Sequence, residues 1–230
     1  GVTELSGGMP AGLEVANQGV SPAPGPKLEL LVVEDNRDVI TYLRTLLEDA
    51  YIVHTASDGA LGFRKALETI PDLIISDVMM PQMDGLTMTK KLKEDLRTSH
   101  IPVVLLTARA DAESKLKGLK SGADAYLAKP FSRRELFVRI ENLIALRRHL
   151  QRRYATPEED LYNLESKRAD AHHREDVFIG QVRRILEAHL DEEEFGISAL
   201  CEALAMSRSQ LYRKFAALTD TTVNQFILNL

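Results

Sequence analysis

The sequence lacks the residues and patterns on which several common classes of protein depend. It has a single cysteine, Cys201, which excludes an internal disulfide; within its apolar stretch we expect a buried thiol. It has no Cys/His cluster with the spacing of zinc ligands, no nucleophile–base triad pattern and no glycine-rich dinucleotide motif. No apolar run is long enough to span a bilayer. Hydrolytic and redox enzymes are therefore distant alternatives, and we expect no membrane contact by this segment.

The overall composition is that of an ordinary globular protein. The 230 residues are 44% hydrophobic and 27% charged, with a formal net charge of −5, which is typical of one or two soluble domains. The adjacent His172 and His173 lie in a charged stretch, where a solvated linker is expected rather than a metal site. Because the chain starts with Gly1 rather than methionine and has no charged-then-apolar leader, we expect either a piece of a longer polypeptide or a trimmed chain. We expect a cytoplasmic location, although the parent protein could be anchored in the inner membrane.

The chain divides into four segments by composition and periodicity. Residues 1–26 are rich in Gly, Pro, Ser and Ala and are predicted to be a linker. Residues 27–146 alternate short β-branched runs with amphipathic stretches, which predicts five βα units around an open parallel sheet. Residues 147–176 are expected to be a connecting helix and linker, and residues 177–230 a small all-α domain. The expected strands are 28–33, 51–55, 72–76, 102–106 and 125–128, and the expected helices 37–49, 58–69, 85–96, 111–120 and 132 onward.

Polar residues follow four of the apolar runs at the point where each expected strand ends. Glu34 and Asp35 follow LELLVV, Asp77 follows DLIIS, Thr107 follows VVLL and Lys129 follows AYLA. In an open parallel sheet the ligand site lies outside the carboxyl ends of the strands, so residues distant in sequence can converge there. The spacing therefore predicts one pocket.

The charges of this pocket indicate its chemistry. Three carboxylates repel one another unless a cation neutralises them, and Mg²⁺ suits oxygen ligands better than zinc does. Beside such an ion, Asp77 is the best candidate for a nucleophile that attacks a phosphoryl group, while Thr107 and Lys129 could bind phosphoryl oxygens. The alternative is a flavodoxin-like domain in which Glu34 and Asp35 only cap a helix. Capping does not explain why the other three residues occur together.

The motifs VVEDN, SDVMMPQMDG, LLTARA and YLAKPF, over about residues 28–146, resemble those of the receiver domain of two-component response regulators. The resemblance implies an α/β fold, a flavodoxin-like (βα)5 doubly wound parallel sheet. It implies that Asp77 is the phosphoacceptor and that Glu34, Asp35, Asp77 and the main-chain carbonyl of Met79 hold Mg²⁺. It also implies a phosphorylated histidine kinase domain as the phosphodonor, in cis or in trans.

The same resemblance implies a switch that responds to phosphorylation. The phosphoryl group adds about −1.5 to −2 charge beside Thr107 and Lys129, which is expected to draw in the loop that carries Thr107 and the small Ala108. In this family an aromatic residue of the fifth strand, here Tyr126, then turns inward; the alternative is a half-exposed strand tyrosine. The face formed by the fourth helix, fifth strand and fifth helix commonly mediates dimerisation, so we expect a homodimer when the protein is phosphorylated.

A helix, a tight turn and a second helix are predicted over ISALCEALAMSRSQLYRKFAAL. Ser207 is the expected N-cap of the second helix. Its polar residues are predicted to face solvent or DNA: Arg208, Ser209, Gln210, Tyr212, Arg213 and Lys214. The segment resembles the first helix-turn-helix of AraC-type transcription factors, with Ser207, Leu211, Arg213 and Phe215 at matching positions. This resemblance implies base contacts by Ser209, Tyr212 and Arg213, and a phosphate contact by Arg208.

The C-terminal segment departs from the AraC-type pattern in two respects. The sequence TDTTVNQFILNL after the second helix lacks the usual G-x-S-P, and the chain stops at Leu230, inside the helix that joins two helix-turn-helix units in that family. We therefore expect a partial domain, with DNA as a partner if the domain is complete. An ordinary helical bundle with a basic solvated face is the alternative.

A receiver followed by an AraC-type segment resembles the C-terminal part of a hybrid sensor histidine kinase, and a stand-alone response regulator is the other known form. Two function classes stay open. One is a phosphorylation-controlled transcription regulator; the other is a phosphorelay or interaction module that passes phosphate without using DNA. In either case the only expected catalysis is the domain's own phosphorylation and dephosphorylation, since no kinase domain is recognised in the sequence.

Overall fold

The computed structural model describes residues 27–108, 122–155, 173–189, 195–219 and 222–228. The expected linker 1–26 and the expected helix 111–120 lie outside the described residues. The described elements are β1 (Glu29–Val33), α1 (Arg37–Leu47), β2 (Ile52–Ala56), α2 (Gly59–Thr69), β3 (Leu73–Asp77), α3 (Gly85–Glu94), β4 (Val103–Thr107), β5 (Ala125–Ala128), α5 (Arg133–Ala155), α6 (His173–Ala188), α7 (Ile197–Ala203), α8 (Arg208–Thr219) and α9 (Val223–Leu228).

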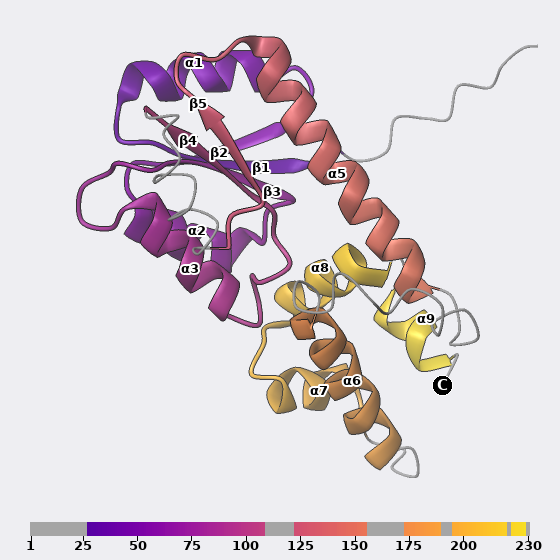
Figure 1. Ribbon diagram of the computed structural model, residues 1–230. Helices are drawn as coiled ribbons and strands as arrows, with labels where there is room; N and C mark the ends of the chain where they lie inside the picture. The colour runs from indigo at the N-terminus through magenta and orange to yellow at the C-terminus, as the bar shows by residue number, and fades with distance from the viewer. Residues whose placement is uncertain (1–26, 109–121, 156–172, 190–194, 220–221, 229–230) are drawn as a thin grey trace, which may run out of the picture.

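The five strands form one parallel sheet in the order β2-β1-β3-β4-β5. Strand β3 lies at the centre and is buried at every position, as expected for a run as apolar as LIIS. Helices α1 and α5 cover one face of the sheet, and α2 and α3 cover the other (Figure 1). This is the flavodoxin-like doubly wound arrangement, in which the crevice between β1 and β3 opens at the carboxyl ends of the strands.

Each face of the sheet has its own hydrophobic core. One core joins Leu43 of α1 and Ile140 of α5 to inward-facing residues of the strands, including Ile75. The other joins Met88 of α3 and Ala66 of α2 to residues on the opposite face, such as Ile74. The alternation of Ile74 and Ile75 between the two cores follows from the two-residue repeat of a strand. Burial on both faces fixes the register and therefore the positions of the strand ends.

Local capping signals begin the helices at the predicted places. The Asn36 carboxamide oxygen accepts the backbone N–H of Asp38 at 2.9 Å, and Asp84 caps α3 by accepting the N–H of Thr87 at 2.6 Å. Ser132 and Glu135 cap α5 reciprocally, with the Ser132 N–H bonding to the Glu135 carboxylate at 2.8 Å. The predicted strands, and the predicted helices that fall on described residues, begin and end within about two residues of the observed elements at most ends.

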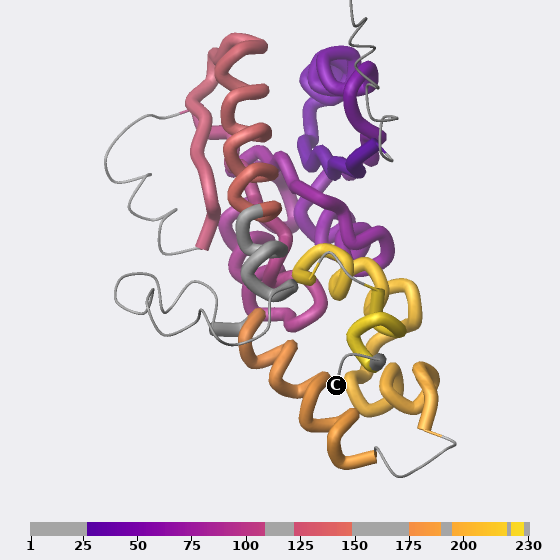
Figure 2. The backbone as a smooth tube through the Cα atoms, turned by 90° about the vertical axis from the view of Figure 1, so that its right-hand side faces the viewer, coloured from indigo at the N-terminus to yellow at the C-terminus, as the bar shows by residue number. Residues whose placement is uncertain are grey.

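The C-terminal helices form a separate small cluster at one end of the sheet (Figure 2). As predicted, α5 continues through RRHLQRRY, to Ala155. Helices α6 to α9 pack around a core that includes Phe178, Leu211 and Phe215, and the Cys201 thiol is free and buried beside them. Among the described helices, none combines the length and the apolar character needed to cross a membrane.

Candidate functional site

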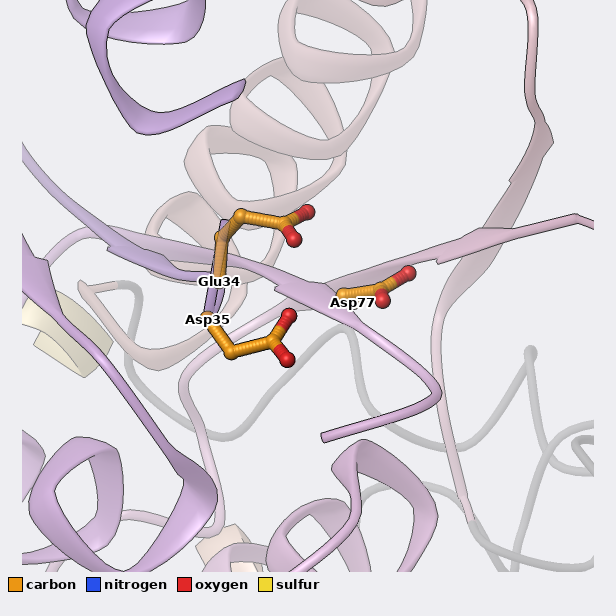
Figure 3. A group of neighbouring side chains, drawn as sticks. All are labelled: Glu34, Asp35 and Asp77. Carbon is orange, nitrogen blue, oxygen red and sulfur yellow. The ribbon is translucent and has the colours of Figure 1, made fainter. Parts of the chain in front are cut away.

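Three carboxylates gather at the carboxyl edge of the sheet, where the sequence predicted them. Glu34 and Asp35 directly follow β1, and Asp77 is the last residue of β3, the neighbouring strand. One oxygen from each of these side chains lies within 4.8 Å of the other two. Glu34 and Asp77 are buried and Asp35 is exposed, and the three side chains extend in the same direction (Figure 3). The set is open to solvent on one side and provides oxygen ligands only.

The Lys129 ammonium group bridges the two buried carboxylates. Its Nζ donates to Glu34 Oε2 at 2.8 Å and lies 3.0 Å from Asp77 Oδ1. Lys129 follows β5, and its backbone N–H donates to the Thr107 carbonyl at 2.7 Å, which fixes the start of its side chain beside β4. A single lysine thus neutralises part of the negative charge that the strand ends bring together. This direct pairing is a contact that spacing alone did not predict.

The pKa values of this group follow from burial and mutual contact. Burial raises the pKa of the Glu34 carboxyl, and the nearby Asp77 charge raises it further, against the lowering effect of Lys129. Burial lowers the pKa of Lys129, but its hydrogen bonds to Glu34 and Asp77 outweigh this effect, so the net pKa lies above the usual value. Lys129 therefore keeps its charge at neutral pH because of the carboxylates beside it.

The loop after β3 holds the Asp77 backbone tightly. The Gly85 N–H donates to the Val78 carbonyl at 3.0 Å, and the Val78 N–H donates to the Leu106 carbonyl at 3.0 Å. A Cβ atom at Gly85 would lie 2.1 Å from the Asp77 carbonyl oxygen, far inside van der Waals contact. Glycine is therefore required where α3 begins, and this close approach sets the position of Asp77.

The remaining predicted pocket residues surround the carboxylates at different exposures. Thr107 is half-buried at the end of β4, and Ala108 follows it on the surface. Tyr126 lies in β5 and packs partly buried against the core on the α2 and α3 side of the sheet. The Met79 side chain is exposed, and its residue lies two positions after Asp77. The structure brings Glu34, Asp35, Asp77 and Lys129 together. Thr107 and Ala108 lie at the end of the neighbouring strand β4, whereas Tyr126 lies within β5, beside Leu105.

The C-terminal cluster contains the predicted helix, tight turn and second helix. Helix α7, a turn at Ala205 and helix α8 follow one another, and Ser207 caps α8 in a reciprocal pair with Gln210, as shown by the Gln210 N–H to Ser207 Oγ bond of 3.2 Å. Arg208 and Ser209 are exposed, whereas Tyr212 is half-buried against the cluster core. Four predicted DNA contacts therefore lie on one helix: Arg208, Ser209, Tyr212 and Arg213.

The prediction that all polar residues of α8 face solvent or DNA is wrong for Lys214. Its side chain is fully buried, with Nζ donating to the Leu96 carbonyl and lying 4.5 Å from the centre of the Phe178 ring. Burial lowers the pKa of Lys214 to about 8, although Glu175 and Asp95 act in the opposite direction. Apolar periodicity could not reveal this, because the lysine is buried against backbone carbonyls and an aromatic face rather than in an apolar core.

The fold and the acidic edge together define a receiver domain, and comparisons with known proteins agree. Residues 30–141 match the family model described as the response regulator receiver domain. Residues 30–141 therefore form a receiver domain of two-component signalling, whose homologues include histidine kinases and response regulators.

Three similar proteins illustrate the kinds of protein in which such a receiver domain occurs. Histidine kinase P4 of Formosa agariphila is 35% identical over 201 residues, which cover 87% of this chain and 14% of that protein. Hybrid signal transduction histidine kinase D of Dictyostelium discoideum is 40% identical over 138 residues, or 59% of this chain and 9% of that protein. The crystal structure of a response regulator receiver domain protein from Clostridium thermocellum has a TM-score of 0.50 at 31% identity, covering 54% of this chain and 98% of that chain. The chain thus spans a small part of the curated relatives it matches.

Proposed function

We propose that this protein accepts a phosphoryl group on Asp77 from a phosphohistidine donor in a Mg²⁺-dependent reaction. The observation that carries the proposal is the bridged set of Glu34, Asp77 and Lys129 at the carboxyl edge of a receiver fold. A carboxylate that ends the central strand, next to a fixed ammonium group, is a nucleophile with electrostatic support already in position.

The donor set fits Mg²⁺. Glu34, Asp35 and Asp77 supply carboxylate oxygens, the exposed side of the pocket leaves room for retained waters, and the Met79 main-chain carbonyl is the proposed fourth protein ligand. When bound, the ion supplies positive charge that offsets the repulsion between the carboxylates and the incoming phosphoryl oxygens. The ion and Lys129 would share the negative charge of Glu34 and Asp77, since Lys129 contacts one oxygen of each carboxylate and each has a second oxygen.

The transfer step would move the phosphoryl group from the donor histidine to Asp77. An Asp77 carboxylate oxygen forms a bond to phosphorus, the phosphorus–nitrogen bond of the donor histidine breaks, and the imidazole leaves with the electron pair and later takes a proton from solvent. The product is an acyl phosphate on Asp77. Lys129 would bind a phosphoryl oxygen, and the Thr107 hydroxyl would donate to another. Movement of Thr107 and Ala108 toward the phosphoryl group is the proposed switch, with Tyr126 following into the space.

The output is proposed to be transcription regulation by an attached AraC-type segment. Residues 27–146 would form the receiver, 147–176 the connection and 177–230 a partial helix-turn-helix domain that reads DNA through Arg208, Ser209, Tyr212 and Arg213. One histidine kinase is similar to this chain over 201 residues, which extends beyond the receiver domain. This similarity supports the proposal that the chain is the C-terminal part of a hybrid histidine kinase. Dimerisation of phosphorylated molecules through the face that carries β5 and α5 would couple phosphorylation to assembly.

A phosphorelay or interaction module is the second candidate. It is favoured by the burial of Lys214, which removes a cation from the surface of the helix expected to read DNA. Return of phosphate from Asp77 to a histidine-containing protein, without salt-dependent binding of DNA, would support this role.

The proposal is tested by incubating the protein with Mg²⁺ and acetyl phosphate and measuring its intact mass. The expected result is the gain of one phosphoryl group, absent from Asp77→Asn and absent when Mg²⁺ is chelated. Asp35→Ala should remain folded but lose the Mg²⁺-dependent gain. If Asp77→Asn is phosphorylated as the unmodified protein is, the assignment of the phosphoacceptor is refuted.

A further inference from the structure

A groove with a volume of about 540 Å³ opens between the C-terminal helices and the receiver domain. Its walls come from α6, from the end of α7 with the turn that follows, and from the loop after α3. Helices α6 and α7 pack against each other at the end of the molecule away from the sheet (Figure 1). Small-molecule sites in proteins have volumes of about 300–1,000 Å³, so the groove is large enough to hold a ligand.

The α6 wall is one face of that helix. Its other lining residues follow Gln181 by three, four, seven and eight positions, which is the spacing of a single helical face. Val182 and Leu186, on an adjacent face, are buried in the core of the C-terminal cluster. The face in the groove is therefore a second surface of α6, separate from the one that holds the cluster together.

Most of the groove is lined by apolar side chains. Ala188, Ala203 and Ala205 are exposed residues that line it, and their short side chains leave the space between the walls open. Leu96 and Leu204 line it as well and are half-buried. Apolar surface gains about 25 cal/mol for each Å² that is removed from water. The groove therefore favours a ligand with an apolar body.

The His189 ring is held in a fixed orientation beside this apolar surface. It stacks on Phe195, with the ring centres 4.2 Å apart and the planes at 17°. Its Nδ1 lies 2.8 Å from the Ile185 carbonyl oxygen. Because a carbonyl only accepts, Nδ1 carries a hydrogen, and Nε2 is left for another partner. Nε2 can accept a hydrogen bond from a carboxylic acid or, when the ring is protonated, donate one to a carboxylate.

Arg184 gives the groove a permanent positive charge. Its Nε donates to the Gly180 carbonyl, one turn earlier in α6, at 3.2 Å. Arg147 is paired with Asp72, whereas Arg184 has no carboxylate partner among the residues that the structure describes. The described residues that line the groove also include no Asp or Glu. A guanidinium group in this setting favours a carboxylate, which its remaining N–H groups can bind as a fork.

We propose that this groove binds a small carboxylate with an apolar body. Arg184 and His189 bind the carboxyl group, and the apolar body packs on the alanines and on Leu96. This activity is separate from phosphoryl transfer and from DNA binding. Leu96 belongs to the receiver domain and the other walls to α6 and α7, so the ligand contacts both parts of the chain. Its binding therefore stabilises their association by mass action.

The test uses hydrocinnamate, a carboxylate joined to a phenyl ring by two methylene groups, with phenylpropylamine as the cation of similar size and shape. Binding of each compound to the full chain is measured by isothermal titration calorimetry at about pH 7. We expect hydrocinnamate to bind at one site per chain and the amine to bind at least about tenfold more weakly. Arg184→Gln should weaken hydrocinnamate about tenfold, a difference of about 1.4 kcal/mol.

Two further variants show where the ligand binds. Arg139→Gln makes the same change of charge at an exposed residue of α5 outside the groove, and it should leave the affinity unchanged. Ala203→Leu places a larger side chain in the groove and should weaken hydrocinnamate at least about tenfold. Circular dichroism and phosphorylation by acetyl phosphate, measured as intact mass, verify that each variant is folded.

Several results would overturn the inference. No detectable binding of hydrocinnamate at about 1 mM would show that the groove is not a site for this class of ligand. Equal affinity of Arg184→Gln and the unmodified protein would show that the cation does not select the carboxylate. Tighter binding of phenylpropylamine would mean that negative charge, which the sequence carries at residues 191–194, determines the choice of ligand. Binding that Ala203→Leu leaves unchanged would place the ligand outside the groove.

Discussion

Replacing Lys129 with methionine tests the electrostatic account of the pocket most directly. The substitution keeps much of the side-chain volume but removes the charge that contacts Glu34 at 2.8 Å and Asp77 at 3.0 Å. Two carboxylates would then face each other without a cation, with their oxygens within 4.8 Å. At an effective dielectric constant of about 20, two unit charges at that distance repel by about 3 kcal/mol. Removing the lysine also removes the cost of burying its charge, which offsets part of this repulsion. We therefore expect the free energy of unfolding of metal-free Lys129→Met to be about 2 kcal/mol lower than that of the unmodified protein at neutral pH.

The loss should depend on pH with a definite sign. Without Lys129, the pKa of Glu34 rises further above its usual value, because the contacts that lowered it are gone. A carboxyl whose folded-state pKa is raised contributes stability that is fully present below its unfolded pKa and is lost as pH rises through the folded value. The variant should therefore approach the unmodified protein near pH 4.5 and fall short of it above that value. Mg²⁺ should stabilise the variant more, since no ammonium group competes for Glu34.

Urea unfolding followed by circular dichroism is the suitable assay, because the chain has no tryptophan. It is performed at about pH 5 and about pH 7.5, with and without Mg²⁺. Lys90→Met is the control, since Lys90 forms an exposed pair with Glu94 on the surface of α3 and should change stability by less than about 1 kcal/mol. If Lys129→Met is as stable as the unmodified protein at both pH values, and Mg²⁺ does not distinguish them, Lys129 does not offset carboxylate repulsion.

Three further predictions concern the scaffold. Gly85→Ala should destabilise the protein by about 3 kcal/mol or more in urea unfolding, because the new Cβ would meet the Asp77 carbonyl, whereas Gly180→Ala, with open space around it on α6, should be neutral or stabilise by up to about 1 kcal/mol. His100 has both ring nitrogens buried, and burial holds its pKa well below 6.5, so the stability of the protein should fall as pH drops below 6.5; His100→Phe should reduce that fall in the urea midpoint. Lys214, with a pKa of about 8 in place of 10.5, should add stability as pH rises from 8 to 10.5, and Lys214→Met should remove this rise in the same assay. Equal pH dependence of a variant and the unmodified protein would refute the corresponding assignment.

The fold and the pocket could be predicted from the sequence because both depend on short-range rules. Asp77 directly follows the run DLIIS, and a buried parallel strand places its last residue at the carboxyl edge whatever the details of packing. Asn36 and Asp84 cap α1 and α3 through their side-chain oxygens, which is a local interaction as well. By contrast, spacing places Lys129 at the same edge but does not give its rotamer, so its bridge between Glu34 and Asp77 was not predicted.

The contact of α8 with the end of α2 and the loop after α3 was not predictable in the same way. Gln210, Arg213 and Lys214 form a polar stripe, and such a stripe on a helix is typical of a solvent-facing side. Their partners are carbonyl groups at the end of α2 and after α3, and these acceptors exist at every helix end regardless of sequence. Hydrophobic periodicity detects apolar interfaces and gives no signal for an interface made from backbone carbonyls. Only the spatial arrangement of α8 against Leu67, Thr69 and Leu96 identifies it.

The two lysines that lie at opposite edges of the receiver differ in the balance of their contacts. Lys129 meets full carboxylates, and these contacts hold its pKa above the usual value despite burial. Lys214 meets a carbonyl and a hydroxyl, and burial lowers its pKa because these neutral acceptors do not repay the lost hydration. The first contact stabilises the charge, while the second is maintained by the packing and hydrogen bonds around it. Lys214 is therefore the more weakly held charge of the two, because the groups that accept its hydrogen bonds carry no charge.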